Sequence, residues 1–173
     1  MMSVILTGFM GTGKTTVGRL LAARLHKPFI DTDHRIEQLE GTSIASIFAT
    51  KGEPYFRRIE RRVIAETVRQ DAVIATGGGA IVDQANYERM HAAGPIICLT
   101  ADIDVILRRT APNDTRPLLG SEPGTRVRQL MSERAPVYAR ADVTIDTSDR
   151  SATAVLEEIL AFLRRTPSEG VQT

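Results

Sequence analysis

The chain has 173 residues, a formal net charge of +1 and a hydrophobic fraction of 42%. That length fits one domain, residues 1–173, that can bury most of its apolar surface. The balanced charge excludes the global field that attracts nucleic acid or an acidic membrane, so neither is expected as a partner. No apolar stretch is long enough to span a bilayer, and the chain enters a strand without a signal peptide. We therefore expect a cytoplasmic protein.

Apolar, strand-like runs alternate with helical patterns along the chain. The strands are predicted over 4–7, 28–31, 72–75, 96–100 and 143–146. The helices are predicted over 14–25, 33–39, 43–50, 54–69, 84–92, 103–109, 125–139 and 151–165. Strands that are apolar on both faces and separated by helices predict an α/β fold, with a parallel sheet covered on both sides and ligands at the carboxyl ends of the strands. The polar residues 167–173 are expected to form a disordered tail.

The first strand leads into a phosphate-binding loop. Residues 8–15 read GFMGTGKT, a full match to G-x-x-x-x-G-K-[ST]. In such a loop backbone N–H groups converge on phosphate oxygens, Lys14 adds a positive charge, and the Thr15 hydroxyl ligates Mg²⁺. A helix starts at the loop and its N-terminus favours anions further. A flexible glycine turn is the alternative.

The second strand ends in the triplet Asp31-Thr32-Asp33. At the carboxyl end of a strand these carboxylates would lie near the phosphate loop. One can help hold hydrated Mg²⁺, and the other can accept hydrogen bonds from a substrate hydroxyl. As an alternative, Asp33 caps the helix that follows. The third strand ends in Thr76 rather than in an acidic residue, so the metal-orienting role falls to Asp31.

Two arginines are candidates for binding an anionic acceptor. Arg57 lies near the start of a helix, where Glu60 could brace its guanidinium, and Arg134 precedes a helix-perturbing proline. Together they could clamp a carboxylate, although their spacing alone leaves this pairing a hypothesis. The glycine run 77–79 would let a ligand approach bare backbone, or would be a plain tight turn.

Residues 111–124 interrupt the alternation with the irregular segment APNDTRPLLGSEPG, which contains Arg116. A long irregular connection in a phosphoryl-transfer enzyme is typical of a mobile lid, and a plain surface loop is the alternative. Cys98 lies in an apolar run and is expected to be a buried structural thiol. The three histidines have no metal-ligand spacing.

The ordered motifs together resemble the shikimate kinase family over roughly residues 3–165. They are GFMGTGKTTVGRLLA, FIDTD, FRRIE, TGGGAI, RRT…TRPLL and ERAPVY. The resemblance implies a three-layer P-loop kinase fold of the nucleoside-monophosphate-kinase type, with a five-stranded parallel sheet in the order 2-3-1-4-5. It also implies a substrate-binding region at about 32–60 and a lid at about 110–124.

The resemblance implies a Mg²⁺-dependent transfer of the ATP γ-phosphate to the 3-hydroxyl of shikimate, in aromatic amino acid biosynthesis. The catalytic residues would be Lys14, Asp33 and Arg116, and the metal would be held by Thr15 and, through water, by Asp31. Shikimate would be bound by Asp33, Arg57, Gly78 and Arg134. ATP would be bound by Gly11, Thr12, Gly13, Lys14, Thr15, Thr16, Arg109, Arg116 and Arg150.

One motif departs from the family, and two other functions stay open. After the last strand the chain has Ser151-Ala152, where members commonly carry a proline that flanks adenine. Another small-molecule kinase on the same scaffold is one alternative, and a nucleotide-dependent switch is the other. Switch GTPases commonly carry an N-K-x-D motif, which is absent here. Since no long apolar seam is visible, we expect a monomer.

Overall fold

The computed structural model describes residues 2–110 and 123–165. All five strands form one parallel sheet in the order β2-β3-β1-β4-β5. The strands are β1 (Val4–Gly8), β2 (Phe29–Asp31), β3 (Val73–Ala75), β4 (Ile96–Thr100) and β5 (Val143–Asp146). The predicted fold class and strand order are therefore confirmed, and every strand lies within one residue of its predicted bounds.

The helices occupy the connections between these strands. They are α1 (Lys14–Leu25), α2 (Thr32–Glu40), α3 (Ile44–Thr67), α4 (Gln84–Ala93), α5 (Ile103–Thr110), α6 (Pro123–Tyr138) and α7 (Ala152–Arg165). A short 3₁₀ turn, η1 (Ala80–Val82), was not predicted. Among the described helices, none has the length and apolar character needed to cross a membrane.

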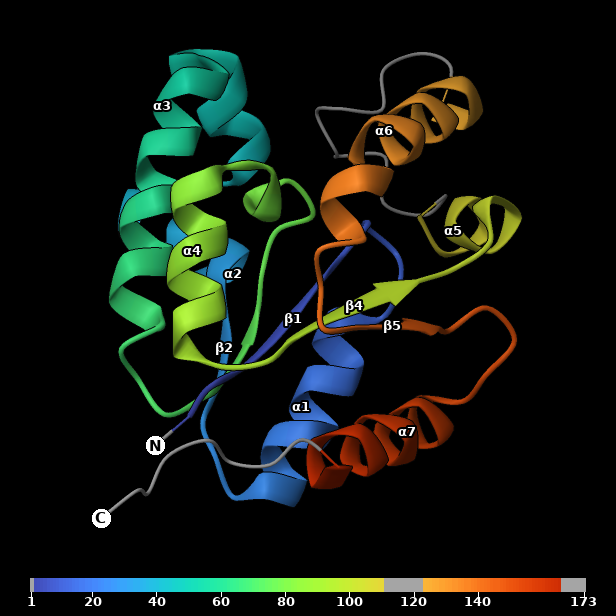
Figure 1. The fold of residues 1–173 in the computed structure, drawn as a ribbon. Helices are drawn as coiled ribbons and strands as arrows, with labels where there is room; N and C mark the ends of the chain where they lie inside the picture. Colours follow the sequence, from blue (N-terminus) through green and yellow to red (C-terminus); the bar gives the residue numbers. More distant parts are fainter. Residues whose placement is uncertain (1, 111–122, 166–173) are drawn as a thin grey trace.

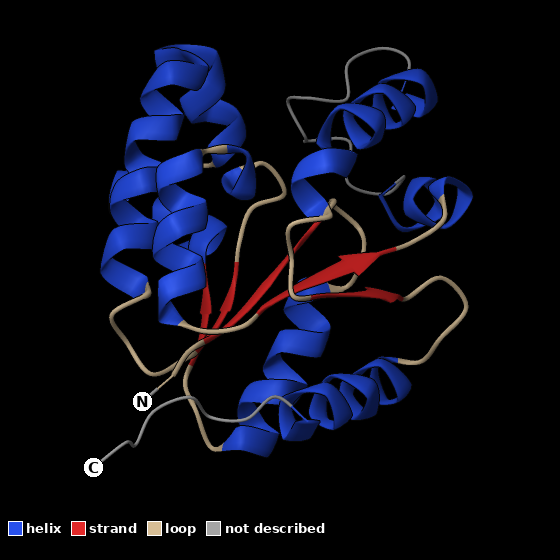
Figure 2. Ribbon diagram, viewed as in Figure 1, coloured by secondary structure: helices blue, strands red, loops and turns tan. Residues whose placement is uncertain are grey.

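Helices cover both faces of the sheet, as Figures 1 and 2 show. Because successive side chains of a strand point to opposite faces, β1 contributes to two cores. Val4 and Leu6 pack toward α1 and α7, while Ile5 packs toward α3 and α4. This burial on both sides explains why the strands are apolar throughout and why the fold has three layers.

The two helices predicted over 43–50 and 54–69 are present as the two halves of α3, which meet at a kink. The helix runs from Ile44 to Thr67, with one residue, Gly52, in a non-helical conformation at φ 78° and ψ 167°. A side chain rarely adopts this positive φ, so glycine permits the kink. Pro54 follows in the first turn of the second half of α3, where a backbone N–H would have no helical partner, so proline is tolerated there. The kink turns both halves of α3 toward the same cleft.

The carboxyl ends of the strands gather the predicted site on one edge of the sheet. The phosphate loop follows β1, the aspartate triplet ends β2, and the glycine run follows β3. This edge is where an open parallel sheet binds its ligands. Residues 111–122, which include Arg116 and most of the expected lid, lie outside the described residues, as does the expected tail over 167–173.

Candidate nucleotide and acceptor site

The phosphate loop is closed by its own polar side chains. The Thr12 hydroxyl is buried and donates to the Phe9 carbonyl at 2.8 Å. The Lys14 ammonium donates to the carbonyls of Gly8 and Phe9, both at 2.8 Å, so it lies across the mouth of the loop. Helix α1 begins at Lys14, and therefore its N-terminus faces the same space.

Thr15 and Asp31 lie side by side at the start of α1 and the end of β2. The Thr15 hydroxyl donates to Asp31 Oδ2 at 2.9 Å. The other oxygen, Asp31 Oδ1, accepts from the backbone N–H groups of Asp33 and His34 and so caps α2. The cap of this helix is thus Asp31 and not Asp33, which leaves the Asp33 side chain available to the cleft.

The Thr15 hydroxyl and the Asp31 carboxylate are suitable ligands for a hard cation. Mg²⁺ prefers oxygen ligands, keeps several waters and is usually bound by one or two protein groups together with substrate phosphates. A hydroxyl and a carboxylate beside the phosphate loop supply that donor set. No cluster of three or more His, Cys, Asp or Glu side chains that could hold a metal occurs in the described part of the chain.

The Asp33 carboxylate is packed against Gly77, in the loop that follows β3. Its Oδ1 atom is buried and has no hydrogen-bond partner in the structure. A Cβ added to Gly77 would lie 2.6 Å from that oxygen and 3.3 Å from Glu60 Oε1, so two carboxylates converge beside Gly77. Burial, followed by the negative charges of Asp31 and Glu60, raises the pKa of Asp33 from 3.8 to about 7.

Arg57 is held by two glutamates on its own helix. Its Nη1 atom donates to Glu60 Oε2 at 2.8 Å, and its Nη2 atom donates to Glu53 at 3.0 Å. Glu60 is 1% exposed, and burial raises the pKa of this carboxyl although the Arg57 charge opposes the shift. The brace predicted for Glu60 is therefore present in the structure. Held in this way, Arg57 lines the cleft.

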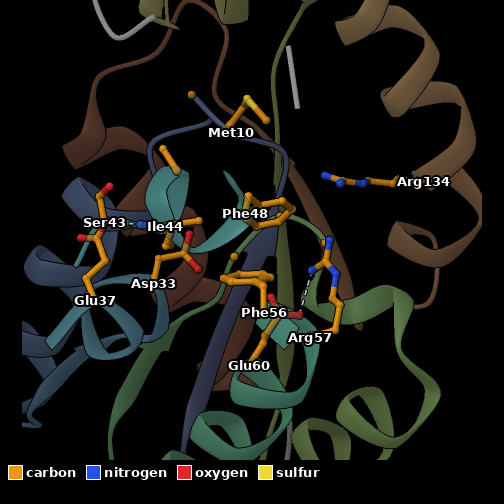
Figure 3. A pocket seen from close by; sticks show the side chains of 15 residues that line it. Met10, Asp33, Glu37, Ser43, Ile44, Phe48, Phe56, Arg57, Glu60 and Arg134 are labelled. Carbon is orange, nitrogen blue, oxygen red and sulfur yellow. Dashed lines mark hydrogen bonds and ion pairs between the residues drawn. The ribbon is translucent and has the colours of Figure 1, made fainter. Parts of the chain in front are cut away.

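Arg134 reaches the same cleft from a different helix, α6. Its side chain is buried, and its guanidinium carbon lies 5.6 Å from the centre of the Phe9 ring. A Cβ on Gly78 would lie 3.3 Å from Arg134 Nη1, so the glycine run admits the guanidinium. Figure 3 shows Arg57 and Arg134 projecting from two separate helices into one space.

The cleft between these groups has a volume of about 520 Å³. Asp33, Arg57, Gly78 and Arg134, the four residues predicted to bind the acceptor, all line it. Gly11 of the phosphate loop also lines it, which joins the two halves of the site. The apolar side chains of Met10, Ile44, Phe48 and Phe56 complete the wall and were not predicted from the sequence.

The two arginines predicted to lie beside the nucleotide, Arg109 and Arg150, do not line the acceptor cleft. Arg109 donates to the carbonyls of Gly11, Thr147 and Ser148, at 3.2, 2.8 and 3.0 Å, and so joins the phosphate loop to the loop after β5. Arg150 instead donates to the Asp146 carbonyl and pairs with Glu158 of α7. Both therefore border the β5–α7 loop. Thr16 is exposed in the first turn of α1.

Two polar residues that join distant loops were missed from the sequence. The Thr147 hydroxyl is buried and donates to the Thr12 carbonyl at 2.9 Å. The Tyr138 hydroxyl donates to the Gly78 carbonyl at 2.6 Å. Tyr138 stands four residues after Arg134 and hence on the same helical face, a spacing that could have indicated it.

The side chains expected to lie outside the site do so. Cys98 is buried in β4, and burial raises the pKa of its thiol to about 11. The histidines, His26, His34 and His91, are all exposed and near helix ends. The arginines neighbouring Arg57 in α3, which are Arg58, Arg61 and Arg62, are exposed.

Comparisons with known proteins agree with this geometry. The family model described as shikimate kinase matches residues 10–164. A shikimate kinase of Caldanaerobacter subterraneus subsp. tengcongensis is 46% identical over 92% of this chain and 95% of its own. One of Thermoanaerobacter pseudethanolicus is 42% identical over 95% of this chain and 98% of its own. The solved structure of a shikimate kinase from Acinetobacter baumannii in complex with shikimate is 39% identical, with a TM-score of 0.91 over 95% of this chain and 93% of that one.

Proposed function

The chain belongs to the shikimate kinase family, and we propose that it transfers the γ-phosphate of ATP to the 3-hydroxyl of shikimate, giving shikimate 3-phosphate and ADP in aromatic amino acid biosynthesis. One observation carries this proposal. A phosphate loop opens directly onto a cleft that has two arginines on one side and a carboxylate of raised pKa on the other. That arrangement suits an acceptor with hydroxyl groups and a single carboxylate.

Arg57 and Arg134 would bind the shikimate carboxylate. Both guanidiniums line the cleft, and one is held in place by Glu60. Charge-assisted hydrogen bonds from two directions orient an acceptor as well as binding it, and orientation is a large part of catalysis. The Gly78 backbone would contact the same ligand, because Arg134 lies beside it and Arg57 lies beside the next glycine, Gly79.

Asp33 would hold the ring hydroxyls and accept the proton of the attacking one. A proton acceptor works best when its pKa lies near the working pH, and the pKa of Asp33 is about 7. The buried and unpartnered Oδ1 atom supports this role, since a bound hydroxyl would supply the missing hydrogen bond.

The phosphate loop, Gly11 to Thr16, would bind the ATP phosphates, with Lys14 beside the β- and γ-phosphates. Thr15 would ligate Mg²⁺, and Asp31 would reach it through water. When bound, this ion would neutralise phosphate charge during transfer. Arg109, whose guanidinium bonds three carbonyls around the loop, would stack on adenine, and Arg150 would lie along the nucleotide.

We also propose that the lid over about 110–124 carries Arg116 to the transferring phosphoryl group. An arginine in this role contributes about 10³–10⁵ in rate. Arg116→Ala should accordingly lower kcat far more than it raises the KM for shikimate, and an unchanged kcat would remove Arg116 from the mechanism. We further propose that the chain is a single kinase domain with its acceptor region at about 32–60. It would act as a monomer in the cytoplasm, without nucleic acid or membrane partners.

The decisive experiment measures ADP formation with and without shikimate, for the wild type and for Arg57→Ala. We expect shikimate-dependent turnover, and a KM for shikimate that rises at least tenfold in Arg57→Ala, because the carboxylate loses a charged partner. The matched control is Arg58→Ala, which removes an adjacent but exposed arginine and should leave the KM unchanged. Turnover that does not depend on shikimate would refute the function.

A further inference from the structure

The last residue of α6, Tyr138, has a polar end that the proposed reaction leaves unused. Its ring packs beside the core under α3 and α4, and its hydroxyl reaches the Gly78 carbonyl at 2.6 Å. The same hydroxyl and the Arg134 Nη1 atom both lie against Gly78. One side chain therefore lies beside two of the residues that line the acceptor cleft.

The hydroxyl group of a tyrosine can act as a hydrogen-bond donor and as an acceptor, so it can serve two neighbours at once. The hydroxyl proton is donated to the Gly78 carbonyl, and the oxygen lone pairs stay available beside the positively charged Arg134 guanidinium. Burial raises the pKa of Tyr138 to about 12. The hydroxyl consequently stays protonated, and keeps its donor, throughout the pH range in which the enzyme works.

Arg134 and Tyr138 are also packed tightly around Gly78. A Cβ on Gly78 would lie 3.3 Å from Arg134 Nη1, 3.5 Å from the Tyr138 hydroxyl and 3.2 Å from the Gly8 carbonyl of the phosphate loop. Because a peptide unit is planar, fixing the Gly78 carbonyl also fixes the N–H of the next residue. A small shift of the tyrosine would thus move both the glycine run and the guanidinium.

We propose that Tyr138 is a positioning residue for the acceptor: it locks the Gly78 peptide and the Arg134 guanidinium into one arrangement before shikimate binds. This inference rests on the proposed function. Preorganised groups bind a ligand without the cost of ordering them, and therefore the lock should appear as affinity for shikimate. It touches neither ATP nor the reacting atoms, so it should not control the chemical step.

The test compares Tyr138→Phe with the wild type and with Tyr87→Phe. The control removes a hydroxyl of the same kind, half-buried against the same core, which lies 3.4 Å from the Arg140 carbonyl and away from the cleft. For Tyr138→Phe we expect the KM for shikimate to rise about tenfold. The KM for ATP should change by less than about twofold and kcat by less than about threefold. Tyr87→Phe should leave all three unchanged.

A second substrate distinguishes a specific effect on the Arg134 guanidinium from a general loosening of the acceptor site. The methyl ester of shikimate has no carboxylate for Arg134 to bind, and hence Tyr138→Phe should weaken it far less than it weakens shikimate. An unchanged KM for shikimate, an equal rise for ATP, or an equal loss for the ester would each overturn the proposal. So would a Tyr138→Phe protein that binds no nucleotide, since Tyr138 would then be structural. Failure of the underlying function is distinguishable, because it would remove shikimate-dependent turnover from the wild type itself.

Discussion

Replacing Asp33 with asparagine should make the ligand-free protein more stable at pH 8 while abolishing most of its activity. The carboxylate is buried, its Oδ1 atom has no partner, and its pKa is raised from 3.8 to about 7. A carboxyl whose pKa is raised by folding favours the folded state only when protonated. That contribution is complete below about pH 4 and is lost as the pH rises through 7.

The magnitude follows from the shift. About three pKa units at 1.36 kcal/mol each give an upper limit of ~4 kcal/mol at pH 8 and under ~1 kcal/mol at pH 4. Urea unfolding of the wild type and of Asp33→Asn at both pH values measures this difference. Asp146→Asn is the control with the opposite sign, because hydrogen bonds from Ser148 lower the pKa of Asp146. A stability difference that is constant with pH, or a less stable Asp33→Asn at pH 8, would refute the reasoning.

Further predictions concern the same site and its supports. Glu60→Gln removes a charge that raises the pKa of Asp33, so the acid limb of kcat/KM should move down by about one pH unit, and a limb that stays in place would contradict this. Thr15→Ala should raise the half-saturating Mg²⁺ concentration about tenfold with kcat lowered as well; unchanged Mg²⁺ titrations would remove Thr15 from the metal site. Gly52→Ala should lower the free energy of unfolding by about 1–2 kcal/mol and raise the KM for shikimate, as measured by urea unfolding and steady-state assays; wild-type values of both would show that the kink is unstrained. The Cys98 thiol should resist alkylation at pH 8 in the folded protein, and rapid labelling would contradict its burial.

The regular elements and the phosphate loop could be predicted because they depend on local patterns. Apolar runs mark strands buried on both faces, and the loop needs glycine, lysine and threonine at set spacings. The Glu60 brace of Arg57 was also foreseeable, since residues three apart on a helix are neighbours. Each of these inferences concerns residues that lie close together along the chain.

Other features of the site depend on contacts between distant segments. The pKa of Asp33 is set first by its burial and then by the charges of Asp31 and Glu60, and periodicity does not report how deeply a side chain is buried. The hydroxyl of Tyr138 meets Gly78 across 60 residues, and that of Thr147 meets Thr12 across 135. The two halves of α3 were predicted as separate helices, but the angle of the kink between them depends on the backbone conformation of Gly52, which glycine permits but does not require.

The central place of β1 in the sheet has a consequence for synthesis of the protein on the ribosome. This strand is made first, yet its two partners are β3, which begins at Val73, and β4, which begins at Ile96. At about 5–20 residues per second, β1 waits on the order of ten seconds for its neighbours. The phosphate loop therefore has no framework while the first half of the chain emerges. Nucleotide binding by a nascent chain should begin only after β4 has left the exit tunnel, which makes ATP a ligand of a chain that already holds β1, β3 and β4 rather than of its earlier intermediates.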